Sequence, residues 1–91
     1  MQTIWKYELI ITDIQEIEIP KNSHILTVQT QRGMPCIWAI IDSEAEKSKL
    51  KIYTFGTGNP IPRNFNGEYI GTYLVKNDEL VFHVFSKRQE G

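Results

Sequence analysis

Residues 4–11 read Ile-Trp-Lys-Tyr-Glu-Leu-Ile-Ile, and apolar side chains alternate with charged ones from Trp5 to Leu9. In an extended strand, successive side chains point to opposite faces, so residues two apart share a face. The apolar face of this strand would hold Trp5, Tyr7, Leu9 and Ile11. Lys6 and Glu8 would face the other way, and Thr12-Asp13 interrupts the pattern. The stretch is therefore typical of a β-strand that packs one face on a core.

The same period recurs along the chain and predicts an all-β fold. We expect further strands at residues 15–19, 24–30, 35–42, 50–55, 69–75 and 79–85. Residues 35–42 and 80–85 are apolar on both faces, which favours central positions in a sheet. Gly33 and residues 76–78 mark hairpin turns. About seven short strands with such turns predict a small antiparallel sandwich or a partly open barrel.

Helix signals are almost absent. The one candidate is 43–49, where Ser43 could cap a helix with Glu46 three residues on. This segment has no apolar face and is too short to persist alone, so we expect a charged excursion with at most one helical turn. Asp42 ends an apolar strand and is expected to cap a turn. Residues 86–91 are expected to form a polar tail.

Composition indicates one small cytoplasmic domain spanning residues 1–91. The chain has 91 residues, 41% of them hydrophobic, and a net charge of −1. That charge gives no basic surface for long nucleic acids, and no apolar run is long enough to cross a membrane. The start of the chain lacks the pattern of a signal peptide. Cys36 is the only cysteine and lies in an apolar run, where a packing role is favoured over reactivity.

The segment 54–64, Thr-Phe-Gly-Thr-Gly-Asn-Pro-Ile-Pro-Arg-Asn, gathers the residues best suited to binding. Its glycines can turn backbone N–H groups toward an anion, and its arginine and asparagines can bind polar groups. The candidate binding residues here are Gly56, Thr57, Gly58, Asn59, Arg63 and Asn64. No phosphate-loop motif is present. A wide turn that needs glycine and proline for its shape is the alternative interpretation.

Aromatic residues form a second set of candidates. Trp5, Tyr7 and Trp38 could stack a base, although large rings in so small a domain more often fill the core. His83 lies between apolar neighbours and is more typical of a satisfied core or rim residue than of a catalyst. We include it among the candidate ligand contacts. The sequence contains no catalytic triad, no metal-ligand pattern and no motif for a cofactor. We therefore expect no catalytic residues, no metal site and no cofactor.

Five segments together resemble a family of short proteins encoded by bacteriophages and prophages and known as a domain of unknown function. The segments are Ile4-Trp5-Lys6-Tyr7-Glu8-Leu9, Cys36-Ile37-Trp38-Ala39, Gly56-Thr57-Gly58-Asn59-Pro60-Ile61-Pro62, Tyr69-Ile70-Gly71-Thr72 and Phe82-His83-Val84-Phe85. The resemblance covers roughly residues 4–85. In that family histidine often stands at the position of Asn59, so a role that needs an imidazole there does not carry over. The resemblance implies no catalytic residues.

A phage origin favours a non-enzymatic protein that counters host defence. One such class sequesters the small nucleotide signals of bacterial immunity and is typically homo-oligomeric. We therefore expect a cytoplasmic binding protein for a small anionic ligand of the cyclic nucleotide class. Two alternatives stay open. One is an inhibitor that contacts a host or phage protein through a strand edge or an aromatic patch. The other is a small phosphodiesterase or hydrolase using His83.

Overall fold

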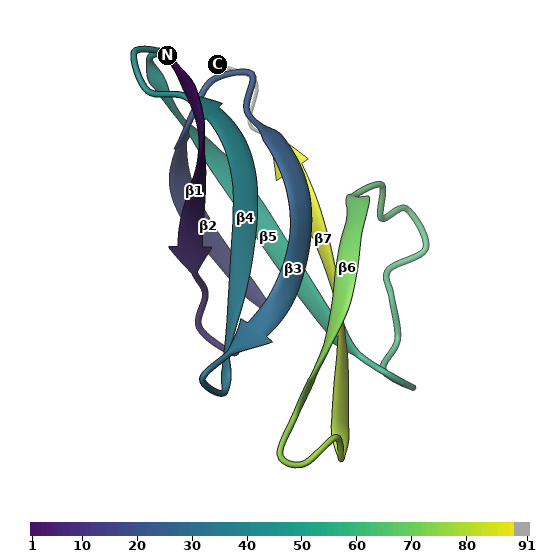
Figure 1. Cartoon of the computed structure of the whole chain (residues 1–91). Helices are drawn as coiled ribbons and strands as arrows, with labels where there is room; N and C mark the ends of the chain where they lie inside the picture. The colour runs from purple at the N-terminus through teal and green to yellow at the C-terminus, as the bar shows by residue number, and fades with distance from the viewer. Residues whose placement is uncertain (89–91) are drawn as a thin grey trace.

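Seven antiparallel strands form the fold in a computed structural model that describes residues 1–88. The strands are β1 (Gln2–Glu8), β2 (Ile14–Pro20), β3 (His24–Gln31), β4 (Met34–Asp42), β5 (Lys47–Gly56), β6 (Glu68–Val75) and β7 (Leu80–Arg88). They make a three-stranded sheet in the order β1-β4-β3 and a four-stranded sheet in the order β2-β5-β7-β6. The two sheets face each other as a sandwich (Figure 1), which confirms the expected all-β class.

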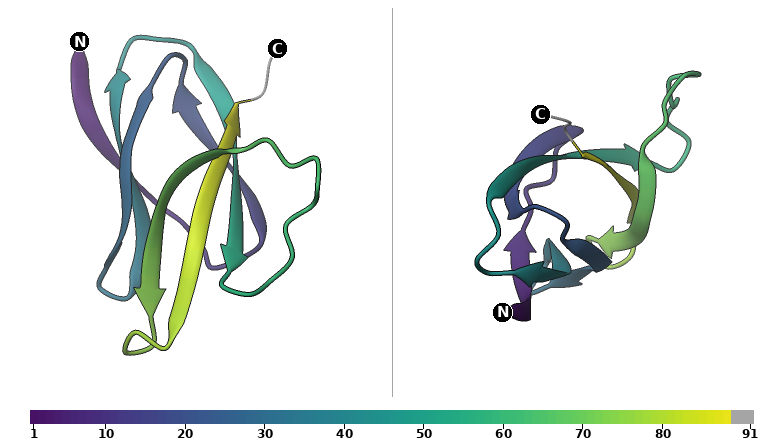
Figure 2. Two further views of the ribbon diagram at one scale, coloured as in Figure 1. Left: turned by 90° about the vertical axis from the view of Figure 1, so that its right-hand side faces the viewer. Right: turned by 90° about the horizontal axis from the view of Figure 1, so that it is seen from above.

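The core fills the space between the sheets. Its buried side chains come from both layers: Leu9, Ile19, Val28, Ile37, Ala39, Ile41, Leu50, Ile52, Tyr73 and Val84. Seen from above, the strands surround this core and one loop projects from the body (Figure 2). β4 has a neighbour on each side in the first sheet, and β5 and β7 have one on each side in the second. The apolar runs 35–42 and 80–85 thus lie in central strands, as expected.

The turns explain where the strands end. Arg32 and Gly33 both have positive φ (54° and 81°) in the β3–β4 hairpin, as a tight two-residue turn requires. At the end of β4, the N–H of Glu44 donates to Asp42 Oδ1 at 3.0 Å, which confirms the turn-capping role of Asp42. The segment 43–46 is a turn without helix, and β5 already begins at Lys47.

Besides the start of β5, two strand limits differ by three residues from the sequence-based expectation. The first strand ends at Glu8, because after it the chain must leave the sheet and cross to β2 in the other layer. The last strand continues to Arg88, so residues 86–88 belong to β7 and not to a polar tail. Their partners are 50–52 on β5, which continue the ladder beyond the apolar run. Residues 89–91 of the expected tail lie outside the described residues.

The segment between β5 and β6 is a crossover and not a simple turn. Both β5 and β6 pair antiparallel with β7, one on each side, so β5 and β6 run in the same direction. A connection between parallel strands must return along the length of the sheet. Residues 57–67 do so: they leave the lower end of β5, swing out to the side of the sheet and cross β7 near its upper end to reach β6 (Figure 2, left). The length of this segment therefore follows from strand order.

The sheets approach each other closely where β3 meets β6. Register shifts mark a bulge in each of these strands, at Leu26 in β3 and at Ile70 in β6. Between the bulges and the lower end, Gly71 lies against Val28: a Cβ at Gly71 would be 2.8 Å from Val28 Cγ1 and 3.6 Å from its main-chain nitrogen. Glycine is needed here because a side chain would push the strands apart.

Candidate functional site

The crossover begins next to His83 on the outer face of the four-stranded sheet. The hydroxyl of Thr57 lies 2.8 Å from Nε2 of His83. On its other side, Nδ1 of His83 lies 3.0 Å from the hydroxyl of Thr72, which in turn is 2.6 Å from the hydroxyl of Tyr69. We call these four residues the hydroxyl–imidazole chain. Two features singled out in the sequence, the glycine-containing segment and His83, thus lie together.

Strand register explains this arrangement. His83 in β7 is opposite Phe55 in β5 on one side and Thr72 in β6 on the other. Side chains directly opposite in neighbouring strands share a face, so these three form a row across the sheet. The alternation also fixes which face: Val84, the next residue, is fully buried in the core, so His83 must point outward.

An aromatic cluster occupies the neighbouring row. Tyr53, Phe85 and Tyr69 are opposite one another in β5, β7 and β6. Phe65, from the crossover, packs edge-on against the rings of Tyr53, Phe55 and Phe85, with centroid separations of 5.1, 5.2 and 5.4 Å. Edge-to-face rings at such distances stabilise each other. The aromatic cluster is defined here as Tyr53, Phe55, Phe65, Tyr69 and Phe85. It holds the crossover to the sheet, and Tyr69 is 56% exposed.

Gly67 allows Phe65 to reach the sheet. A Cβ at Gly67 would lie 2.8 Å from Cε2 of Phe65 and closer still to its Cζ. Any larger residue at position 67 would therefore displace the ring from the aromatic cluster. The ring of Phe65 packs directly on the backbone of Gly67, and this contact fixes the end of the crossover that precedes β6.

Lysines border the aromatic cluster on the side away from His83. Lys51 and Lys87 are opposite each other in β5 and β7, one row beyond Tyr53 and Phe85. Glu16 in β2 is opposite Lys51 in the same row, so the row carries both signs with one more cation than anion. The outer face thus presents cations, aromatic rings and hydroxyl groups in adjacent rows.

The glycine segment itself offers less to an anion than its composition suggests. The N–H of Thr57 donates to the carbonyl of Val81 at 3.2 Å, and the N–H of Asn59 donates to the carbonyl of Gly56 at 3.0 Å. These two donors of the expected anion nest are therefore engaged within the protein. Gly58 has a φ of +90°, so a glycine supplies the turn conformation that the alternative interpretation requires.

Carboxylates also flank this segment. A groove of about 380 Å³ on one side is lined by Asp13 and Asn59 together with Ile14, Tyr53, Thr54, Phe55, Pro60, Pro62 and Phe65. A second hollow of about 440 Å³ is lined by Glu79 beside Gly56, Thr57 and Asn59. A carboxylate near an anion raises its free energy of binding, so the glycine end of the face is the less suitable place for a phosphate.

The other predicted site residues lie elsewhere. Trp5 and Tyr7 share a face, as expected, but it is the inner face of β1: Tyr7 packs against the core and Trp5 is 36% exposed at the edge. Lys47 Nζ lies 5.3 Å from the centroid of the Trp5 ring. Trp38 lies on the outer face of the other sheet, opposite Lys6. None of these three can stack a base held near the crossover of the same molecule.

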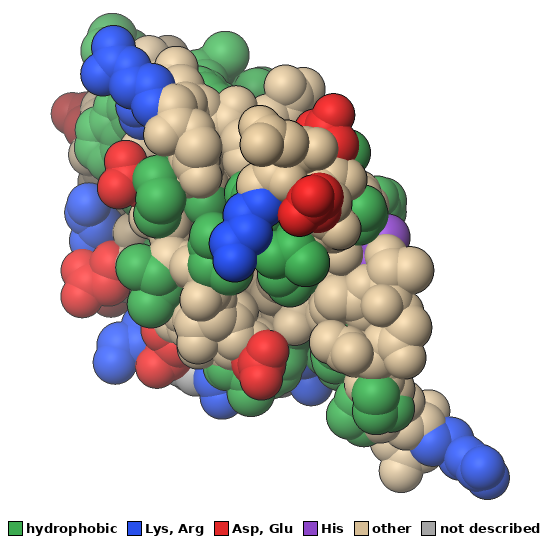
Figure 3. Space-filling model, turned by 90° about the horizontal axis from the view of Figure 1, so that it is seen from below, with side chains coloured by type: hydrophobic (Ala, Val, Ile, Leu, Met, Phe, Trp, Pro, Cys, Tyr) green, Lys and Arg blue, Asp and Glu red, His purple; other side chains and the backbone are tan. Residues whose placement is uncertain are grey.

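Arg63 and Asn64 are exposed in the outer part of the crossover. Within residues 1–88, no hydrogen bond or ion pair holds either side chain. Viewed from below, the molecule has hydrophobic side chains spread between charges of both signs, without a field of one sign (Figure 3). An electrostatic surface for a long polyanion is therefore not present on this face.

Sequence reasoning missed six residues on the outer face of the four-stranded sheet that the site uses: Lys51, Phe65, Tyr69, Thr72, Phe85 and Lys87. The parity of β7 could have placed Phe85 on the face of His83, since the two are two residues apart. Parity alone would not have placed Tyr69 and Thr72, because the bulge at Ile70 changes the alternation between them. Nothing local in the sequence indicates that Phe65 folds back onto the sheet.

Among residues 1–88 the structure contains no group of three potential metal-ligating side chains, and no helix whose length and apolarity would let it cross a bilayer. Comparison with known proteins yields no significant match to a curated protein or to a solved structure. One family model, described as a domain of unknown function (DUF7352), matches residues 1–91. Because the match extends over the whole chain, the protein belongs to this family.

Proposed function

We propose that the protein is a non-enzymatic binding protein that sequesters a small anionic ligand of the cyclic nucleotide class on the outer face of the β2-β5-β7-β6 sheet. In this proposal it acts in the cytosol of a host cell and serves a phage by withdrawing a signal of bacterial immunity. The phage setting rests on the resemblance described above. The ligand class rests on the chemistry of the face.

One observation carries the proposal: cations, aromatic rings and hydroxyl groups occupy three adjacent rows of one sheet face. Lys87 can pair with phosphate, while Lys51, beside it in the same row, has Glu16 opposite it in β2. The exposed ring of Tyr69, 56% accessible, can stack on a base, an interaction worth about 1–3 kcal/mol. The hydroxyls of Thr57 and Thr72 can bond a ribose or a base edge. A nucleotide combines these three kinds of group.

The hydrogen bonds of His83 favour binding over catalysis. In a catalytic hydroxyl–histidine pair one ring nitrogen accepts from the nucleophile's hydroxyl, and the other nitrogen is usually oriented by a carboxylate, which is absent from the hydrogen bonds of His83 within residues 1–88. Both nitrogens of His83 are within hydrogen-bonding distance of threonine hydroxyls. In the proposed complex the ligand therefore contacts the hydroxyls of Thr57 and Thr72, and His83 holds these hydroxyls in place.

A thermal-shift screen against cyclic and linear nucleotides tests the proposal. A ligand present at a hundred times its Kd should stabilise the fold by about 2.7 kcal/mol, equivalent to a Tm rise of about 10–20 °C. Heat denaturation of the complex should release the ligand chemically intact. The absence of any shift would refute the ligand class, and recovery of a hydrolysed product would refute sequestration.

Two substitutions locate the site in the same assay. Tyr69→Ala should remove the stacking surface, and Lys87→Gln should remove a cation. Each should reduce the ligand-induced Tm rise, measured from the variant's own Tm without ligand. Lys87→Gln should leave that Tm nearly unchanged because the side chain is exposed, whereas Tyr69→Ala should lower it through the lost contacts with Phe85 and Thr72. Lys76→Gln, in the β6–β7 hairpin, is the matched control and should leave the ligand-induced rise unchanged.

A free strand edge favours a second candidate function, protein recognition. β1 is an edge strand, and its residue Ile4 is 55% exposed. An unpaired edge can accept a strand from another chain. This candidate predicts that nucleotides leave the Tm unchanged and that the protein captures a specific host or phage protein. The same edge could pair two copies of the chain, which would provide the expected homo-oligomer.

A further inference from the structure

A polar cavity opens between β3 and β6, away from the outer face discussed above. It has a volume of about 330 Å³ and is lined by His24, Ile25, Leu26, Glu68, Tyr69, Ile70, Ser86 and Arg88. Both bulges of the structure, at Leu26 and Ile70, lie in its wall. Bulges bend strands locally and are frequent at binding sites. β3 and β6 are thus apart at the bulges and come into contact farther along, where Gly71 lies against Val28.

Strand register directs the charged groups of this cavity inward. Val84 is buried in the core, so Ser86 and Arg88 at two-residue intervals point to the same side of β7. Glu68 is directly opposite Ser86 on β6 and therefore shares that side. Both residues are nevertheless exposed, so the cation and the anion lie at the open end of the sandwich, where a ligand can reach them.

Ser23 fixes the guanidinium of Arg88. Nη1 of Arg88 donates to the hydroxyl of Ser23 at 3.4 Å, and Nη2 donates to the main-chain carbonyl of the same residue. Ser23 is only 5% exposed, so the anchor is part of the folded structure. These bonds use two of the five N–H donors of the guanidinium and leave the others available.

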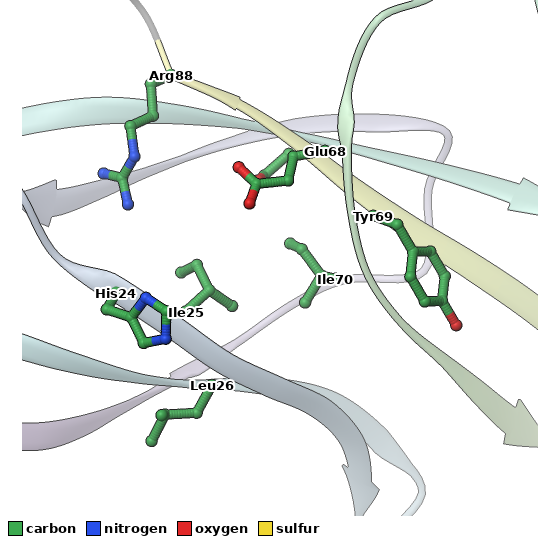
Figure 4. A pocket seen from close by; sticks show the side chains of 8 residues that line it. His24, Ile25, Leu26, Glu68, Tyr69, Ile70 and Arg88 are labelled. Carbon is green, nitrogen blue, oxygen red and sulfur yellow. The ribbon is translucent and has the colours of Figure 1, made fainter.

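Glu68 and Arg88 face the same opening without being paired. Among residues 1–88, no ion pair or hydrogen bond joins Glu68 to Arg88. Figure 4 shows the carboxylate and the guanidinium directed into the opening from neighbouring strands, with Ile25 and Ile70 between them and β3. The ring of Tyr69 points away from it. The cavity therefore holds separated opposite charges in a mostly polar lining, with the side chains of Ile25 and Ile70 beside them.

We propose that this cavity binds a zwitterionic amino acid. The carboxylate of the ligand pairs with Arg88, its ammonium pairs with Glu68, and its side chain packs on Ile25 and Ile70. A zwitterion fits because each of its charges meets the opposite charge, whereas a simple anion would also face Glu68 and a simple cation would also face Arg88. The anchored guanidinium lowers the conformational entropy lost on binding. This site shares Tyr69 with the proposed nucleotide face, but the ring of Tyr69 points away from the cavity.

A set of leucine derivatives tests this proposal by NMR. Leucine should shift the amide resonances of residues 23–26, 68–70 and 86–88. N-acetyl-leucine lacks the ammonium and leucinamide lacks the carboxylate, so each should bind at least about tenfold more weakly than leucine. Equal binding of all three compounds, or no shift with leucine in the millimolar range, would overturn the proposal.

Variants separate the two charge contacts. Glu68→Gln should weaken leucine by about tenfold and leave N-acetyl-leucine no weaker than before. Arg88→Lys keeps the charge and should retain part of the leucine affinity that Arg88→Gln loses. Lys87→Gln, the neighbouring cation on the opposite face, is the matched control. If Lys87→Gln weakened leucine as much as Arg88→Gln, the assignment to this cavity would be wrong.

Discussion

The hydroxyl of Tyr7 lies inside the sandwich without a hydrogen-bond partner among residues 1–88. Burial raises the pKa of this phenol above its ordinary value of 10.0. An unpaired buried hydroxyl costs free energy, because it has lost its bonds to water. We expect Tyr7→Phe to stabilise the fold by about 1 kcal/mol, which raises the Tm by about 4–8 °C in a domain of this size.

Thermal unfolding followed by circular dichroism measures this effect. Trp38→Phe is a suitable comparison, since it also alters an aromatic residue but one on an outer face. A lower Tm in Tyr7→Phe would show that the hydroxyl has a partner in solution, such as a bound water.

Asp42 gives the protein a pH dependence at the acid side. The N–H of Glu44 and then the N-terminal ammonium hold the pKa of Asp42 below its ordinary value of 3.8. A carboxylate with a lowered pKa stabilises the fold above its unfolded pKa, and this contribution disappears as the pH falls through the folded pKa. Asp42→Asn keeps an oxygen for the turn and removes this titration. We expect the Tm of the variant to fall less steeply than that of the parent below pH 3.8.

The N-terminal ammonium gives the stability of the fold a pH dependence at the alkaline side. Its hydrogen bonds to Asp42 and Glu44 raise the pKa of the amino group above 8.0. This contribution is present below pH 8.0 and disappears as the pH rises through the folded pKa. Both groups are exposed, so the effects should be small. Parallel Tm curves for parent and Asp42→Asn across the acid range would contradict the assignment.

At the scale of elements, the contact between Gly71 and Val28 determines how closely β6 approaches β3. Gly71→Ala places a methyl group 2.8 Å from Val28 Cγ1, and we expect a loss of about 1–3 kcal/mol in the free energy of unfolding. In a Val28→Ala background the same change should cost at least about 0.5 kcal/mol less, because the contact that it crowds has been removed.

Urea denaturation of the four proteins in this cycle measures the coupling. Ile41→Val is the control background, since it alters a core side chain that is not among the nearest atoms to Gly71. Equal costs of Gly71→Ala in all backgrounds would show that the strands do not touch at this point.

Local periodicity was sufficient to predict most of the elements. The alternation of Glu16 and Glu18 with Ile17 and Ile19 predicted β2 and its outward charges, and two-sided apolarity predicted that β4 and β7 are central. The crossover was not predicted, because its length depends on β5 and β6 lying on either side of β7. Strand order is set by contacts between distant residues, and no window of sequence contains them.

At the scale of the molecule, the free edge of β1 predicts how copies associate. Leu9 N–H bonds the carbonyl of Pro35, and Ser43 N–H bonds the carbonyl of Met1, so odd-numbered residues of β1 bond to β4. In an antiparallel pair the alternate residues direct their N–H and C=O groups outward. Ile4 and Lys6 therefore offer unpaired groups along the edge.

We expect Ile4→Pro to abolish self-association without unfolding the protein. Proline removes an N–H that bonds nothing within the sheet, and prolines are tolerated at such edge positions. Light scattering after size exclusion should give a dimer for the parent protein and a monomer for the variant. A parent protein that is monomeric at all concentrations would contradict pairing through this edge.

The site was less predictable than the fold, and the reason lies in its assembly. Thr57 and His83 were identified as candidates from residue type, and the structure brings them together. Trp5 and Tyr7 were identified in the same way, but their strand turns them inward. The alternation of residues 4–11 predicted that this face packs on the core, as it does, whereas the bulge at Ile70 kept the alternation of β6 from predicting that Tyr69 and Thr72 both face outward.

The hydroxyl–imidazole chain has a direction that can reverse. With the proton on Nδ1, His83 donates to Thr72, Thr72 can donate to Tyr69, and the Tyr69 hydrogen is left to point outward. With the proton on Nε2, every bond runs the other way and the Thr57 hydrogen is left outward. The neutral ring thus offers an outward hydrogen at one end of the chain or at the other, never at both. A molecule bound at the Tyr69 end would thereby determine whether the Thr57 hydroxyl offers its hydrogen or only its lone pairs to a second molecule, although no strand moves. Thr57 lies 26 residues before His83 in sequence.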